Sequence, residues 1–219
     1  MPEPTYADGA RRAAPLAIAG VFDGLTFGVL ATSAGFGGLP TLVMSATTNA
    51  GSAQFAAASL LGAGSGVLAA VSTALLLNTR SLLMGISVSP ALRGGRLRRF
   101  ATAQLVTDES WALGQVEPGR WDRRLVVGAG LAMYASWVGG TALGLAGAGL
   151  IDDPRRFGLD AAFFAVFLAV LALQLRTPAA RLAALGGAAV ALALVPFTPT
   201  GVPILAASCV ALAGARRRV

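Results

Sequence analysis

The chain has 219 residues, of which 55% are hydrophobic and 12% are charged, whereas a soluble domain is about 25% charged. It has no histidine and one cysteine, Cys209, which argues against a metal centre, an intrachain disulfide and a catalytic triad. The net charge of +7 comes from arginines in short segments between apolar runs, a pattern typical of membrane proteins and not of a nucleic-acid-binding face. We therefore expect an integral membrane protein that is not an enzyme and has no cofactor, no metal and no nucleic-acid partner.

Apolar runs dominate the sequence, and a spanning helix needs about 20 mostly apolar residues. The candidate runs are 13–34, 40–61, 65–90, 125–150, 159–175, 181–196 and 201–215. The expected fold is an all-α polytopic membrane protein with about six or seven transmembrane helices, some of them broken or re-entrant. The expected organisation is a cytoplasmic tail (1–12), one membrane domain (13–215, with possible halves 13–90 and 125–215 joined by 91–124) and a basic cytoplasmic C-terminus (216–219).

The arginines set the expected orientation. If Arg12 and Arg93 both lie in the cytoplasm, an even number of crossings separates them, yet three apolar runs lie between them. The run 40–61 is the best candidate for one that does not cross, because its centre is polar and rich in small residues. In the competing topology, 40–61 and 100–116 both cross and four arginines lie outside. The first topology places both termini in the cytoplasm.

Two polar groups lie in the first two runs. Asp23, between glycines in the middle of 13–34, is a candidate for binding a substrate ammonium or carrying a proton, or for a buried pair with Arg80. Asn49, Gly51 and Gln54 lie in the polar centre of 40–61. A helix broken here would direct backbone N–H groups at a substrate carboxylate, whereas the alternative role for these side chains is hydrogen bonding between helices.

Arg80, with Asn78 nearby, lies midway along 65–90, where an arginine requires a carboxylate, exposed carbonyls or an anionic substrate group. Asp23, Asp108 and Glu109 are its candidate partners. Thr107, Asp108 and Glu109 also fit the start of a helix, with Thr107 as its cap, or a cytoplasmic-side gate or proton acceptor.

The fourth run combines aromatic residues with closely spaced glycines. Tyr134, Trp137 and Thr141 share one face at helical spacing, and Gly140 and Gly144 form a G-x-x-x-G pair. Such a pair permits tight helix packing, within the chain or at an interface with a second subunit. Asp160 stands at the start of the fifth run, where it can cap that helix.

Five blocks of the sequence resemble the AzlC family, the larger subunits of two-component branched-chain amino-acid exporters. The blocks occur in family order and spacing at 49–55, 78–85, 105–112, 134–141 and 158–167. The positions that match family motifs are Gln54, Asn78, Arg80, Thr107, Asp108, Glu109 and Trp137. Two positions depart from the family pattern: Ser81 replaces a frequent histidine, and Asp23 replaces a proline or small residue.

The resemblance implies export of valine, leucine and isoleucine, with methionine as a further candidate, together with a small membrane partner of the AzlD type. Together with the intramembrane polar residues, the resemblance implies a multi-pass secondary transporter of the bacterial inner membrane, which we expect to be driven by the proton gradient. With no histidine in the chain, a carboxylate (Asp23, Asp108 or Glu109) would carry the proton. The alternatives are an uncoupled channel for small solutes and a membrane scaffold subunit that does not transport.

Overall fold

The computed structural model describes residues 3–117, 119–148, 175, 177–198, 202–203 and 206–207, and gives the backbone but not the side chain of Arg80. The helices of this part are α1 (Tyr6–Ser33), α2 (Gly38–Thr48), α3 (Gly51–Gly62), α4 (Val67–Val88), α5 (Arg96–Ala103), α6 (Asp108–Leu113), α7 (Arg123–Ala148) and α9 (Pro178–Leu194). Three of them, α1, α4 and α7, are long and apolar enough to cross a membrane. The expected runs 159–175 and 201–215, and Asp160, lie almost wholly outside the described residues.

The helix α1 begins earlier than the hydropathy pattern suggested. Thr5 and Asp8 form a capping box, in which the Asp8 carboxylate accepts from the Thr5 amide at 2.9 Å and the Thr5 hydroxyl accepts from the Asp8 amide at 3.2 Å. These bonds satisfy N–H groups that have no partner in the first turn of a helix. Residues 6–12 of the expected N-terminal tail are therefore part of α1.

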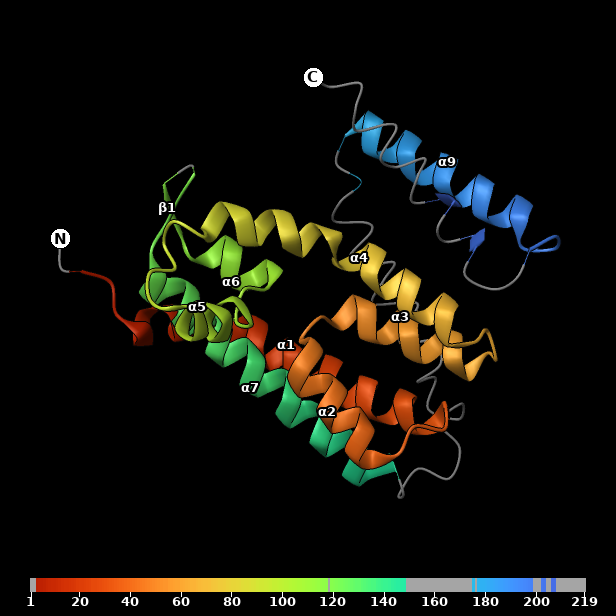
Figure 1. Cartoon of the computed structure of the whole chain (residues 1–219), viewed down its shortest axis with the longest axis horizontal. Coiled ribbons are helices and arrows are strands. Elements are labelled where there is room, and N and C mark those ends of the chain that lie inside the picture. The colour runs from red at the N-terminus through yellow and green to blue at the C-terminus, as the bar shows by residue number, and fades with distance from the viewer. Residues whose placement is uncertain are drawn as a thin grey trace.

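Helices α1 and α7 pack lengthwise against each other (Figure 1). Their contact is glycine-lined on both sides. A Cβ added at Gly24 of α1 would lie 2.4 Å from the Trp137 carbonyl oxygen, and one added at Gly140 of α7 would lie 2.2 Å from the Val21 carbonyl oxygen. Gly140 and Gly144 thus serve close packing within this chain, which is the first of the two roles expected for them.

Two adjacent glycines of α7 provide a matched test of this packing. We expect Gly140→Ala to destabilise the protein by about 1–3 kcal/mol, because the methyl group would overlap the α1 backbone. Gly139→Ala should have little effect, since a Cβ there meets nothing within 4 Å. Thermal unfolding of the two purified variants in detergent measures the difference. Equal unfolding temperatures would contradict the close approach of α1 and α7.

The run 40–61 forms two half-length helices, α2 and α3, separated at Asn49 and Ala50. Their 11 and 12 residues correspond to about 17 and 18 Å, against about 30 Å of hydrocarbon. A Cβ added at Gly62, the last residue of α3, would lie 2.9 Å from the Cβ of Ala34, just after α1. The chain therefore enters and leaves on the side where α1 ends, as the re-entrant prediction required.

The arginine-bearing segments before α4 and between α4 and α7 gather at the opposite end of the helices, around the N-terminus, α5, α6 and the start of α7 (Figure 1). Arg12 donates to the Leu113 carbonyl at 3.4 Å, and Arg124 pairs with Glu3 at 2.7 Å. Arg93 and Arg123 line the same pocket. Arg12 and Arg93 therefore lie at one end of the helices, as an even number of crossings between them requires.

The expectation of an all-α fold is wrong in one segment. A hairpin of β1 (Gln115–Glu117) and β2 (Arg120–Trp121) lies between α6 and α7. Gly119 in its turn has φ +75°, a left-handed conformation that glycine adopts without steric cost. Strands of three and two residues are too short to produce a recognisable alternation in the sequence.

Candidate functional site

The break between α2 and α3 is the centre of the candidate site. Asn49 adopts a left-handed conformation (φ 42°, ψ 43°), which an asparagine tolerates better than most side chains, and α3 then begins at Gly51. Ala50 occupies the N-cap position of α3 and provides no side-chain cap. The positive end of the α3 dipole is thus directed into the protein at the depth where the hairpin turns.

Side chains from three other elements bind the last carbonyl groups of α2. The Gln54 amide of α3 donates to the Met44 oxygen at 2.7 Å, and the Tyr134 hydroxyl of α7 donates to the Ala46 oxygen at 3.0 Å. The Gln104 amide, just after α5, donates to the Thr47 oxygen. The last four carbonyl groups of a helix have no intrahelical partner, so the bonds to Ala46 and Thr47 satisfy two of them, and all three bonds hold the break in place.

One face of α7 supports the whole re-entrant hairpin. Trp137 donates from Nε1 to Gln54 Oε1 at 2.8 Å, and the Thr141 and Ser45 hydroxyls are hydrogen-bonded at 2.9 Å. With Tyr134, this confirms that Tyr134, Trp137 and Thr141 share one face. Both ends of the Gln54 amide are engaged within the protein and the side chain is fully buried. Gln54 therefore acts as a structural bridge between α2, α3 and α7.

Three aromatic rings from three helices pack beside the break. Phe27 of α1 stacks on Trp137 with ring centroids 6.0 Å apart, and Phe55 of α3 meets both rings edge-on, at 5.8 Å from Phe27 and 6.0 Å from Trp137. A Cβ added at Gly51 would lie 2.9 Å from the Trp137 ring. The first residue of α3 is thus held against the indole, and a larger residue would displace one of them.

Asn49 and Gln104 connect the break to the segment that follows α5. The Asn49 side chain donates to the Gln104 carbonyl oxygen at 3.0 Å, while the Gln104 side chain binds Thr47 in return. Sequence reasoning missed Gln104 and Ser45. An amide among apolar residues was the available signal for Gln104, whereas a lone serine gives none.

The carboxylates of the expected proton route lie on two short stretches of chain. Thr107 caps α6, accepting from the Ser110 amide at 3.3 Å, so the capping role expected for this segment is confirmed. Asp108 and Glu109 occupy its first turn. Glu109 is close enough to Asp23 of α1 for the two carboxylates to interact electrostatically. Asp23 is half-buried, and α1 contacts α6 directly.

Asn78 and Arg80 lie on α4, which packs against α3. The Oδ1 atom of Asn78 is buried and accepts no hydrogen bond within the described structure. A buried acceptor without a donor costs free energy, so it is a natural contact for a donor that arrives with a ligand. The backbone places Arg80 near the middle of α4, but its side chain, and with it the expected pairing with Asp23, Asp108 or Glu109, lies outside what the structure describes.

These features define an integral membrane protein whose spanning helices surround a re-entrant, polar helix break. Residues 15–151 match the family model described as AzlC protein. The chain is 36% identical to an uncharacterized membrane protein of Archaeoglobus fulgidus over 204 residues, which cover 91% of this chain and 88% of the relative. The chain belongs to the AzlC family.

Two further relatives are named proteins. The chain is 28% identical to the inner membrane protein YgaZ of Escherichia coli, with 75% of this chain and 73% of the relative covered. It is also 28% identical to the branched-chain amino acid transport protein AzlC of Bacillus subtilis, with 70% of this chain and 61% of the relative covered. No solved structure matches the chain.

Proposed function

We propose that this chain is the larger subunit of a secondary transporter that exports branched-chain amino acids across the inner membrane of a bacterium. The single observation that carries the proposal is the broken helix pair α2–α3, whose break faces the aromatic cluster of Phe27, Phe55 and Trp137. Membrane transporters characteristically bind substrates at such breaks. The name of the Bacillus subtilis relative supports amino acids with branched side chains as the substrate class.

The two ends of the substrate zwitterion would meet different groups. Its carboxylate would bind at the start of α3, where the helix dipole favours a negative charge. Arg80 is the alternative cationic partner of that carboxylate. The ammonium group would bind Asp23 or the buried Oδ1 atom of Asn78. Gln54 is removed from this role, since its amide is already engaged at both ends.

The apolar part of the substrate would pack against the aromatic cluster. An aliphatic side chain gains contact area from aromatic rings without needing polar partners, which favours valine, leucine, isoleucine and methionine over charged amino acids. Proton coupling would pass through Asp23, Asp108 and Glu109. The contact between α1, which carries Asp23, and α6, which carries Asp108 and Glu109, supports a shared route for the proton.

The arginine-rich end of the helices would lie in the cytoplasm, because short cytoplasmic loops carry an excess of arginine and lysine. We further propose that the chain works with a small membrane subunit of the AzlD type. Export by the chain together with this subunit, but not by either alone, is the expected result if the partner is required.

Excretion from amino-acid-loaded cells tests the proposal. Cells fed dipeptides that contain valine, leucine, isoleucine or methionine should excrete these amino acids when they produce the chain with its partner. We expect Arg80→Ala to reduce excretion to the background level, because it removes a cation from the middle of α4. The matched variant Arg96→Ala, at an exposed position of α5, should retain excretion.

No excretion by the intact pair, with both proteins present in the membrane, would overturn the exporter proposal. A scaffold subunit would give no excretion, and its Arg80→Ala variant would still fold and reach the membrane. An uncoupled channel would release the amino acids only down their concentration gradient.

A further inference from the structure

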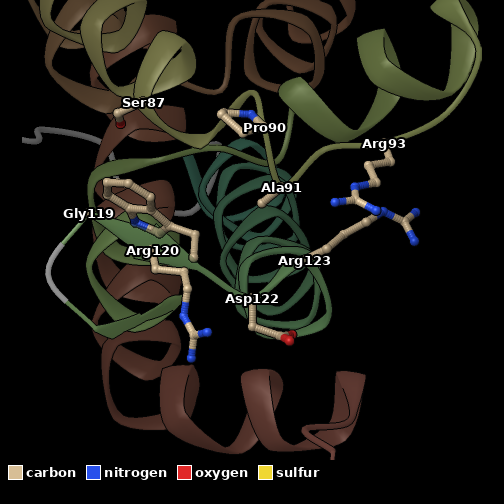
Figure 2. A pocket seen from close by; sticks show the side chains of 9 residues that line it. Ser87, Pro90, Ala91, Arg93, Gly119, Arg120, Asp122 and Arg123 are labelled. Carbon is tan, nitrogen blue, oxygen red and sulfur yellow. The ribbon is translucent and has the colours of Figure 1, made fainter.

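A pocket of about 360 Å³ lies at the arginine-rich end, away from the helix break. It forms where the end of α4 meets the β1–β2 hairpin and the start of α7 (Figure 2). Its charged lining consists of Arg93, Arg120, Asp122 and Arg123. Neither the helix break nor the proposed proton route uses these residues.

Two of the four charges already have partners. The Arg120 guanidinium pairs with Glu117 at 3.0 Å, and in Figure 2 it extends away from the other two arginines. The Asp122 carboxylate accepts from the backbone amides of Arg124 at 2.8 Å and Leu125 at 3.1 Å, so it caps the start of α7. With Arg120 paired to Glu117, the two cations Arg93 and Arg123 outweigh the single Asp122 carboxylate, so the pocket keeps an excess of positive charge.

The side chains of Arg93 and Arg123 both line the pocket, and their ends overlap in the view of Figure 2. Within the described part of the chain, neither group forms an ion pair with a carboxylate. Arg123 donates to the Tyr6 hydroxyl at 3.1 Å, but its Nε atom is buried and has no acceptor among the described residues. Two cations that line one pocket, one of them with an unused buried donor, are stabilised by an anion that accepts from both.

The wall of the pocket is fixed by hydrogen bonds and by aromatic packing. Trp111 donates from Nε1 to the Ser87 hydroxyl at 2.8 Å, and Trp121 donates to the Trp111 carbonyl at 2.9 Å. The two indoles pack with centroids 5.4 Å apart. This end of the helices therefore combines tryptophans with arginines, which is the composition of a membrane–water interface. Basic pockets between helices at that level suit lipid head groups.

We propose that Arg93 and Arg123 bind the phosphate group of an anionic ligand in this pocket. The phosphate oxygens would accept from both guanidiniums, including the buried Nε–H of Arg123. A planar guanidinium matches phosphate oxygens well, because it can donate two parallel hydrogen bonds. The position at the end of the spanning helices favours an anionic phospholipid as the source of the phosphate over a free anion.

Phosphatidylglycerol titrated into the purified protein in a neutral detergent, with bound lipid counted by native mass spectrometry, tests this site. The intact chain should bind phosphatidylglycerol more tightly than phosphatidylcholine. In the double variant Arg93→Gln/Arg123→Gln, the dissociation constant should rise about tenfold or more, since two charge-assisted contacts are lost. Arg96→Gln/Arg98→Gln removes the same net charge from exposed α5 positions and should change it less than about twofold.

The single variant Arg93→Gln keeps the test valid if the double variant fails to fold. The Arg93 side chain is exposed, so the fold should survive its replacement while part of the affinity for phosphatidylglycerol is lost. Displacement of phosphatidylglycerol by excess inorganic phosphate would assign the site to a free phosphate anion. Retention of the lipid would assign it to the phospholipid. Equal binding of the two lipids by the intact chain, or an equal loss of affinity in the α5 control variant, would overturn the proposal.

Discussion

Trp137→Ala should lower the free energy of unfolding by about 3 kcal/mol or more, which is among the largest effects expected at a single position. The substitution removes a ring that contacts Phe27 and Phe55, and it leaves Gln54 Oε1 without its donor. Because lipid tails are as apolar as the protein interior, the loss comes from packing and hydrogen bonding rather than from transfer out of water. Denaturant or thermal unfolding in detergent measures it.

Two variants separate these contributions. Trp137→Phe keeps an aromatic ring but loses the N–H group, so it should cost about 1–3 kcal/mol through the unsatisfied Gln54 oxygen. Phe22→Ala removes a large ring from a position of α1 that is 66% exposed, and it should cost much less. The packing account fails if Trp137→Ala is no more destabilising than Phe22→Ala.

Neutralising Asp23 should abolish accumulation of valine driven by the proton gradient. In inside-out vesicles with an acidified lumen, one proton exchanged per valine supports about tenfold accumulation for one pH unit, since that unit is worth about 1.4 kcal/mol. We expect the Asp23→Asn variant to bring valine only to equal concentrations on both sides of the membrane. The same is expected of Glu109→Gln, because Glu109 interacts electrostatically with Asp23. Asp108→Asn tests the third carboxylate of the proposed route.

Glu117→Gln is the matched control for this series, because Glu117 pairs with Arg120 in the exposed hairpin and lies outside the proposed route. It should retain accumulation. A protonophore should abolish accumulation in the wild-type chain and leave Asp23→Asn unchanged. Full accumulation by Asp23→Asn, Asp108→Asn and Glu109→Gln would refute carboxylate-based coupling.

The break in 40–61 could be predicted from the sequence because it depends on local composition. Arginines that must lie on the same side of the membrane required one of the three runs between Arg12 and Arg93 not to cross. The small and polar residues at the centre of 40–61 identified that run. Likewise, the spacing of Tyr134, Trp137 and Thr141 fixes their common face within one helix. Properties of a single segment can therefore be predicted from the residues of that segment.

Contacts between segments cannot be predicted in the same way. The sequence left two roles open for Gln54, a substrate contact or hydrogen bonding between helices, and only the structure shows that its amide links Met44 to Trp137. The structure also brings Asp23 near Glu109, a pairing that no spacing indicates. Such contacts depend on how α1, α6 and α7 pack, and close packing depends on glycines such as Gly24 and Gly140 whose partners the sequence does not name.

Protection of the start of α3 by substrate tests the central claim most directly. In a chain with Cys209→Ser, a cysteine introduced by Ser52→Cys would lie in the first turn of α3, and one introduced by Ser59→Cys would lie about two turns further along the helix. We predict that leucine slows modification of the Ser52→Cys variant by a thiol reagent, whereas glutamate does not, and that neither amino acid slows modification of the Ser59→Cys variant. Unchanged modification of the Ser52→Cys variant at saturating leucine, in a variant that still exports leucine, would place the substrate elsewhere.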